Sequence, residues 1–83
     1  MREIVAGIHT WSVFNEEKGL DFNGHLVVND DGCVLVDPPP MGPRELEAME
    51  RLGPPTAVVI TNRHHTRDAM AAAARWRIRI LMH

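Results

Sequence analysis

The 83-residue chain has little aromatic character and little cysteine: no tyrosine, two tryptophans, two phenylalanines and one cysteine, Cys33. With so few aromatic side chains, aliphatic residues must form most of any core. A single cysteine excludes an internal disulfide, and the histidines and the cysteine show no zinc-finger spacing. One unpaired thiol also fits a reducing compartment. We therefore expect a thin core without covalent cross-links.

Long hydrophobic runs are also absent. No apolar stretch approaches the roughly 18 residues that cross a bilayer, and the first residues lack the apolar segment of a signal peptide. We therefore expect a soluble, cytoplasmic protein with no membrane partner. Apolar residues still make up 45% of the chain and charged residues 24%, which is the balance of a globular protein. At this length we expect one domain over residues 1–83.

Charge is unevenly distributed along the sequence: the first half has few basic residues, and the second half has almost no acidic ones. Residues 1–50 contain ten acidic and three basic residues, whereas residues 51–83 contain six arginines and one acidic residue, Asp68. The net charge of -2 by itself argues neither for nor against nucleic-acid binding. We interpret the two halves as packed neighbours whose charges partly cancel. A basic nucleic-acid surface is the less favoured alternative, so nucleic acid is not the expected partner.

The first half of the sequence is typical of antiparallel strands. Residues 3–14 are rich in β-branched and aromatic residues and predict one long strand or two short ones, followed by a turn at 15–19. Two apolar runs, 25–28 and 34–36, flank Asp31-Gly32. An Asp-Gly pair between apolar runs is a strong hairpin signal, because glycine accepts the positive φ that the turn requires. We therefore predict a β-hairpin here.

In the second half, after a proline-rich loop, strands and helices alternate. The predicted elements are a helix from Pro43 to Leu52, a buried strand at 56–61, a helix at 67–75 with Thr66 as its N-cap, and a strand at 78–82. The expected fold class is α/β, a β-hairpin followed by βαβ units. Its last strand leaves an open sheet edge and an apolar surface. We therefore expect a homo-oligomer, or a partner chain that covers the open edge.

Three motifs carry a resemblance to a known family. They are Asn23-Gly24-His25-Leu26-Val27-Val28, then Val34-Leu35-Val36-Asp37-Pro38, then Val58-Val59-Ile60-Thr61-Asn62-Arg63-His64-His65. In their order and spacing the chain resembles the N-terminal part of the metallo-β-lactamase fold, over essentially its whole length. The resemblance implies the N-terminal half of an αββα sandwich, in a truncated member whose second sheet and later metal ligands are missing. It also implies membership in a superfamily of metal-dependent hydrolases.

The resemblance places a metal-binding motif, His-x-His-x-Asp-His, directly after the buried strand. At the four ligand positions of this motif the chain has Asn62, His64, Thr66 and Arg67. By resemblance the cofactor would be zinc or another divalent metal, and the donors left for a makeshift site are His64, His65 and Asp68. Catalytic zinc needs about three protein ligands. We therefore expect a hydrolase-like protein that is weakly active or inactive alone, in which no catalytic residue can be named.

Considered without the family, the turn from Thr61 to Asp68 has another interpretation. The N-H groups and dipole of a helix N-terminus favour an anion, and the side chains that add donors are Arg63, Thr66 and Arg67. The alternative is structural: Asn62 and Thr66 satisfy the turn, and Asp68 pairs with Arg67 or with the helix end. We favour the structural interpretation and keep anion or nucleotide binding as a hypothesis.

Several other polar residues are interpreted as structural. Asp37 follows a strand next to the site and is predicted to accept hydrogen bonds from loop N-H groups. Cys33 is predicted to be a half-buried, unreactive thiol. Glu50 is assigned to a solvated helix face. Three functions therefore stay open: a metal-dependent hydrolase-like protein, a noncatalytic module that self-associates through its sheet edge or apolar face, and an anion-binding protein.

Overall fold

The computed structural model describes residues 1–61 and 66–82. Within these residues, six strands and two helices follow one another in the order β1 (Arg2–Val5), β2 (Ile8–Asn15), β3 (Leu20–Asn29), β4 (Gly32–Val36), α1 (Pro43–Leu52), β5 (Pro55–Ile60), α2 (Thr66–Trp76) and β6 (Arg79–Met82). The predicted α/β class is confirmed. The apolar region at 3–14 forms two strands, β1 and β2.

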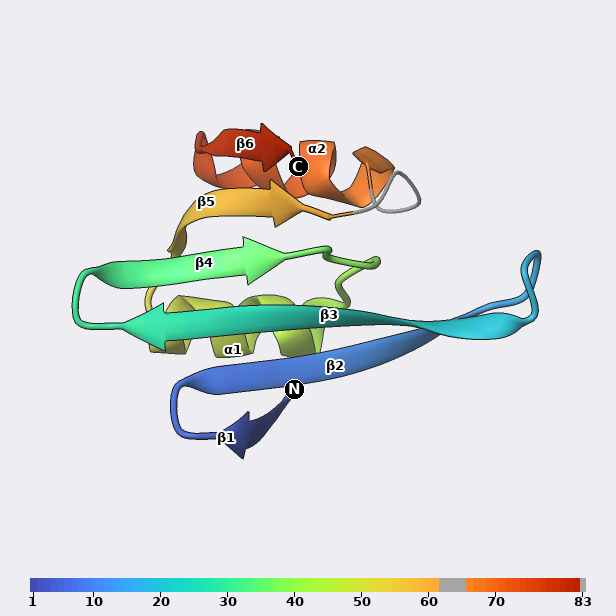
Figure 1. The fold of residues 1–83 in the computed structure, drawn as a ribbon, viewed down its shortest axis with the longest axis horizontal. Coiled ribbons are helices and arrows are strands. Elements are labelled where there is room, and N and C mark those ends of the chain that lie inside the picture. The colour runs from blue at the N-terminus through green and yellow to red at the C-terminus, as the bar shows by residue number, and fades with distance from the viewer. Residues whose placement is uncertain (62–65, 83) are drawn as a thin grey trace.

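The strands lie in the sheet in the order in which they occur in the sequence (Figure 1). β1 to β4 pair as antiparallel neighbours, and β4, β5 and β6 are parallel. This is a set of hairpins followed by two βαβ units. Both crossovers step in the same direction along the sheet, and such crossovers are right-handed. Both helices therefore lie on one face of the sheet, as Figure 1 shows.

Strand β3 begins five residues before the apolar run at 25–28 that predicted it. The additional residues are held by pairing with β2, from Asn15↔Leu20 at the turn to Trp11↔Gly24. They include Asp21, Asn23 and Gly24, which are residue types with low strand propensity. The β2–β3 hairpin extends beyond the other strands (Figure 1). The first part of β3 is a strand because it pairs with β2, and not because of its own sequence.

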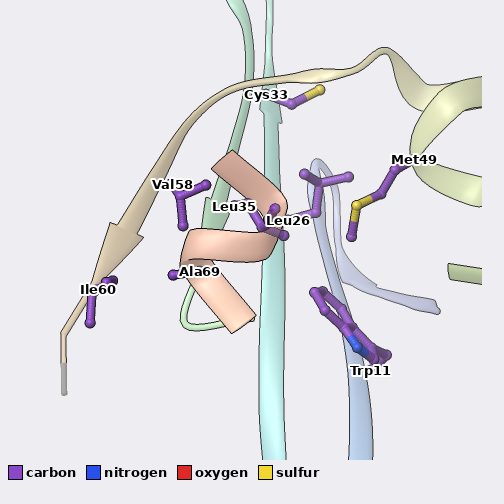
Figure 2. Close-up of a cluster of buried hydrophobic side chains, with 9 residues drawn as sticks. Trp11, Leu26, Cys33, Leu35, Met49, Val58, Ile60 and Ala69 are labelled. Carbon is purple, nitrogen blue, oxygen red and sulfur yellow. The ribbon is translucent and has the colours of Figure 1, made fainter. Parts of the chain in front are cut away.

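The core lies between the sheet and the two helices (Figure 2). Leu26, Leu35 and Val58 occupy matching positions on β3, β4 and β5 and are completely buried. Met49 of α1 and Ala69 of α2 cover them. Alanine at the sheet side of α2 lets that helix approach closely, so a core with few aromatics still closes.

The other face of the sheet is built from the alternate residues of the same strands, because successive side chains point to opposite faces. In the described part of the chain no helix lies over this face (Figure 1). We call it the open face and define it by seven apolar residues on matching register positions: Val5, Ile8, Val27, Val34, Val36, Val59 and Leu81.

Candidate functional site

The expected site lies where the parallel strands β4 and β5 end, at the same edge of the sheet. Asp37 follows β4 and Thr61 follows β5. Asp37 is 8% exposed, and its Oδ1 accepts the Thr61 backbone N-H at 2.7 Å. The Thr61 hydroxyl donates to Oδ2, and the Asp37 N-H donates to the Val59 carbonyl at 2.9 Å. Both carboxylate oxygens are thus used to join the two strand ends.

The backbone of Asp37 is held in an unusual conformation. Its φ is 46°, in the left-handed region that non-glycine residues rarely occupy, and the residue after it is a proline. A proline normally drives its preceding residue toward extended backbone. Such a conformation costs on the order of 1–3 kcal/mol. The hydrogen bonds to Thr61 and Val59 offset this cost, which supports a structural role for Asp37.

The proline loop after Asp37 packs closely on the sheet. Pro38 and Pro39 are fully buried. A Cβ atom at Gly24 would lie 2.5 Å from Cδ of Pro39 and 2.7 Å from Cη2 of Trp11, so only glycine fits at this position of β3. The contact fixes the loop against the hairpin, and with it the position of the strand end that carries Asp37.

Most of the predicted metal and anion residues lie outside the described residues. Asn62, Arg63, His64 and His65 fall in the undescribed segment, and the side chain of Arg67 is not described. Thr66 is the first residue of α2 and has an interaction partner. Asp68 lies in the first turn of α2, is partly buried and has an interaction partner. The ligand and anion assignments therefore stay predictions.

The donor chemistry at this edge does not fit a preformed zinc site. Among residues 1–61 and 66–82, no three His, Cys, Asp or Glu side chains form a group that could hold a metal ion. The Asp37 carboxylate is already engaged by Thr61. At the motif positions the sequence offers an amide, an imidazole, a hydroxyl and a guanidinium. A guanidinium stays protonated and does not bind metal.

A mostly apolar cavity of about 260 Å³ lies beside this edge, between the proline loop and the two helices. Its lining includes Pro39, Leu46, Asp68, Ala72 and Arg75. Nothing in the sequence indicated it, because its walls come from three separate segments that look like ordinary core and loop. The cavity separates α1 from α2 at the end near the proline loop.

Polar contacts between the two helices were also missed by the sequence analysis. Glu50 of α1 accepts a hydrogen bond from Nε1 of Trp76 in α2 at 3.2 Å. The Arg75 guanidinium lies 3.9 Å from the same carboxylate and 5.6 Å from the centroid of the Trp76 ring. Glu50 is exposed, as predicted, but it also links the acidic half of the chain to the basic half.

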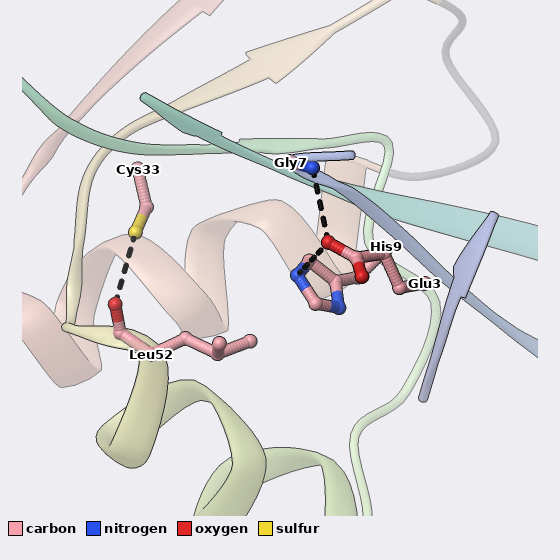
Figure 3. Close-up of polar contacts among 5 residues, drawn as sticks. All are labelled: Glu3, Gly7, His9, Cys33 and Leu52. Carbon is pink, nitrogen blue, oxygen red and sulfur yellow. Dashed lines mark hydrogen bonds and ion pairs between the residues drawn. The ribbon is translucent and has the colours of Figure 1, made fainter. Parts of the chain in front are cut away.

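Cys33 is buried, with 2% exposure, and not half-buried as predicted, because the end of α1 lies over it. Its Sγ lies 3.7 Å from the Leu52 carbonyl oxygen (Figure 3) and 3.3 Å from that of Gly53. The thiol therefore donates to carbonyl groups that the helix leaves unpaired at its C-terminus. Burial raises the pKa of the Cys33 thiol, which keeps it protonated and unsuited to act as a nucleophile.

At the opposite edge of the sheet, polar contacts close the β1–β2 turn. The Glu3 carboxylate accepts the Gly7 N-H at 3.0 Å and lies 3.8 Å from Nε2 of His9 (Figure 3). This group is separated from Asp37 by two strands, since β2 and β3 lie between β1 and β4, the strand that Asp37 follows. It stabilises a turn and contributes nothing to the candidate site.

Comparison with known proteins gives one family. A model of the metallo-beta-lactamase superfamily matches residues 4–82, which is nearly the entire chain. No match was found among curated proteins. Among the described residues, no helix has both the length and the apolar character needed to cross a membrane.

Proposed function

The chain belongs to the metallo-β-lactamase superfamily, and from this premise we propose that it is a hydrolase-like member with weak hydrolytic activity, or none, on its own. Members of the superfamily commonly bind zinc, which serves as a Lewis acid and activates water.

The observation that carries the proposal is the donor set that follows β5. Of the four motif positions, His64 alone keeps an imidazole, and Arg67 adds a permanent positive charge where a cation would bind. Asp37, the nearest described carboxylate at this edge, is committed to Thr61. Metal binding would have to compete with these hydrogen bonds and with the positive φ that they maintain.

The experiment compares the natural chain with a variant in which the motif is restored, N62H/T66D/R67H. Each protein is dialysed against zinc, then against buffer, and its zinc content and hydrolysis of p-nitrophenyl esters and phosphodiesters are measured. We expect only traces of zinc in the natural chain and about one zinc ion per restored chain. Adding His64→Ala to the restored variant should release that zinc. Asp37→Asn is the control expected to leave zinc content unchanged.

The proposal is wrong if the natural chain keeps stoichiometric zinc after dialysis and hydrolyses these substrates in a reaction that His64→Ala abolishes. Circular dichroism of every variant distinguishes loss of metal from loss of fold.

A second candidate function is that of a noncatalytic, self-associating module. The open face favours it: seven apolar side chains lie across six neighbouring strands, and the described helices cover only the other face. Val5 is 57% exposed and Leu81 is 48% exposed, at the two ends of this face. Contiguous apolar surfaces of this kind are typical of binding sites for other proteins.

A further inference from the structure

Another cavity, of about 290 Å³, lies between the β1–β2 hairpin and the C-terminal half of α1. It is lined by three apolar residues and three ionisable ones: Met1, Ala48, Leu52, Glu3, His9 and Arg51. Glu3 and His9 lie opposite each other on β1 and β2, in one row with the core residue Leu26, so both are on the helix face of the sheet. The site at Asp37 uses none of these residues.

The β1–β2 turn fixes the Glu3 carboxylate at one side of this cavity. Gly7 has a φ of 82°, and a Cβ atom there would lie 2.7 Å from the Val28 carbonyl oxygen, so the turn requires glycine. The Gly7 carbonyl accepts the Val28 N-H at 2.7 Å, and the Gly7 N-H donates to Oε2 of Glu3 at 3.0 Å. The carboxylate is therefore held by a turn that is itself bound to β3.

The Glu3 carboxylate in turn orients the His9 ring. Oε2 of Glu3 lies 3.8 Å from Nε2 of His9, whose side chain is only 15% exposed. Figure 3 shows the second ring nitrogen on the side away from this carboxylate. A carboxylate beside Nε2 favours the tautomer that carries its proton there. The neutral ring then leaves Nδ1 as a hydrogen-bond acceptor for a ligand.

Arg51 supplies a positive charge from the α1 side of the cavity. It is exposed, and neither of the two ion pairs among the described residues, Glu3–His9 and Glu50–Arg75, involves it. A basic residue in the last turn of a helix suits the helix dipole, and this role leaves the N-H donors of its guanidinium for another partner. A planar guanidinium binds a carboxylate through two parallel hydrogen bonds.

The volume of the cavity sets the size of a ligand. A dry apolar cavity of about 150 Å³ takes up benzene, which has six carbon atoms. On the same scale, the cavity beside His9 has room for roughly ten to twelve non-hydrogen atoms. Met1, Ala48 and Leu52 provide apolar surface for the body of such a molecule.

We propose that this cavity binds a small hydroxycarboxylate with an apolar body. The ligand carboxylate pairs with Arg51, its hydroxyl donates to Nδ1 of His9, and its apolar part packs on Leu52. Glu3 sets the direction of binding, because its negative charge disfavours a second carboxylate beside the ring. The inference goes beyond the hydrolase-like function and does not depend on it, since none of these residues belongs to the motif after β5.

The first test titrates three ligands into the natural chain and follows its amide NMR spectrum. Mandelate has a carboxylate, a hydroxyl and an apolar ring, phenylacetate lacks the hydroxyl, and phenylethylene glycol lacks the carboxylate. We expect mandelate to bind with a dissociation constant of about 0.1–1 mM and the other two to bind roughly tenfold more weakly, with shifts in β1, β2 and the end of α1. No saturable mandelate binding up to about 10 mM, or shifts centred elsewhere, rejects the site. Equal affinity for phenylacetate rejects the hydroxycarboxylate class.

The second test assigns the two polar contacts with variants. Arg51→Gln should weaken mandelate and phenylacetate alike, by about tenfold, whereas His9→Leu should weaken mandelate alone and so remove the preference for the hydroxyl. The matched control is Arg44→Gln, which removes the same charge from an exposed position in the first turn of α1 and should bind as the natural chain does. Equal losses in the two arginine variants overturn the proposal, because overall charge would then explain binding. The dispersion of each amide spectrum reports folding, and if a variant unfolds, the ligand comparison on the natural chain decides.

Discussion

The two faces of the sheet come from alternating residues of the same strands, yet they differ in how they are covered. Leu35 faces the helices and is fully buried, whereas its neighbour Val36 lies on the open face and is only half-buried. The helix face combines leucine and methionine with small alanines, and the open face is rich in valine. The comparison teaches that one strand sequence can specify two surfaces, one that packs on the helices and one that the described helices leave uncovered.

The largest expected effect is a difference in stability between substitutions on the two faces of the sheet. Leu35→Ala should lower the free energy of unfolding by about 2–5 kcal/mol, because it leaves a cavity among residues that cannot fully collapse. Val36→Ala should cost about 1 kcal/mol or less, since its side chain is already partly exposed. Urea unfolding at low protein concentration, where association does not contribute, provides the measurement. Equal losses would mean that the faces do not differ in packing.

A smaller effect tests how closely the helix face is packed beside the candidate site. Gly24→Ala should cost about 1–3 kcal/mol, because its Cβ would overlap Pro39 and Trp11. The control is Gly42→Ala, whose new Cβ would meet only the flexible Glu45 carboxylate at 3.3 Å. Thermal unfolding compares the two variants. A Gly24→Ala protein as stable as the control would show that the proline loop can move away from the sheet.

The smallest effect is a pH dependence that originates on the helix face. Burial raises the pKa of Cys33 in the folded chain, so above the ordinary thiol pKa the unfolded chain releases a proton that the folded chain keeps. This contribution to stability is complete below the ordinary thiol pKa and is lost as the pH rises through the folded pKa. Denaturation at a series of alkaline pH values should show this decline in the natural chain.

The matched variant for this pH series is Cys33→Ser, which keeps a hydrogen-bond donor but does not titrate in the same range. Its stability profile should lack the thiol-dependent decline. Parallel profiles for the two proteins would contradict the assignment to Cys33.

Much of the fold was predictable from the sequence, because local signals coincide with the structure. Asp31-Gly32 lies at the β3–β4 turn, and Pro43 and Leu52 bound α1 as predicted. The first part of β3 was not predictable, since Asp21 and Asn23 become strand only by pairing with β2. Local propensity carries no information about such a partner.

The candidate site was predictable only in part. The sequence indicated that Asp37 accepts hydrogen bonds, but not that Thr61, 24 residues later, supplies them. That contact depends on β4 and β5 being parallel neighbours whose register places their ends side by side, with Val36 opposite Val59. The link between Glu50 and Trp76 likewise depends on how two helices pack, which a single sequence does not reveal.

The sequence-ordered sheet also has a consequence for how the protein acquires its structure. Every strand pairs with a neighbour in the chain, so the sheet contains no strand that must wait for a distant segment to be inserted beside it. Pairing between strands that follow one another in the chain keeps each loop that must close shorter than an interleaved strand order would, which favours faster folding. During synthesis the hairpins can form first, and β5 and β6 then add one at a time as they leave the ribosome. Pulse-labelling hydrogen exchange should show protection in β2 and β3 before β6.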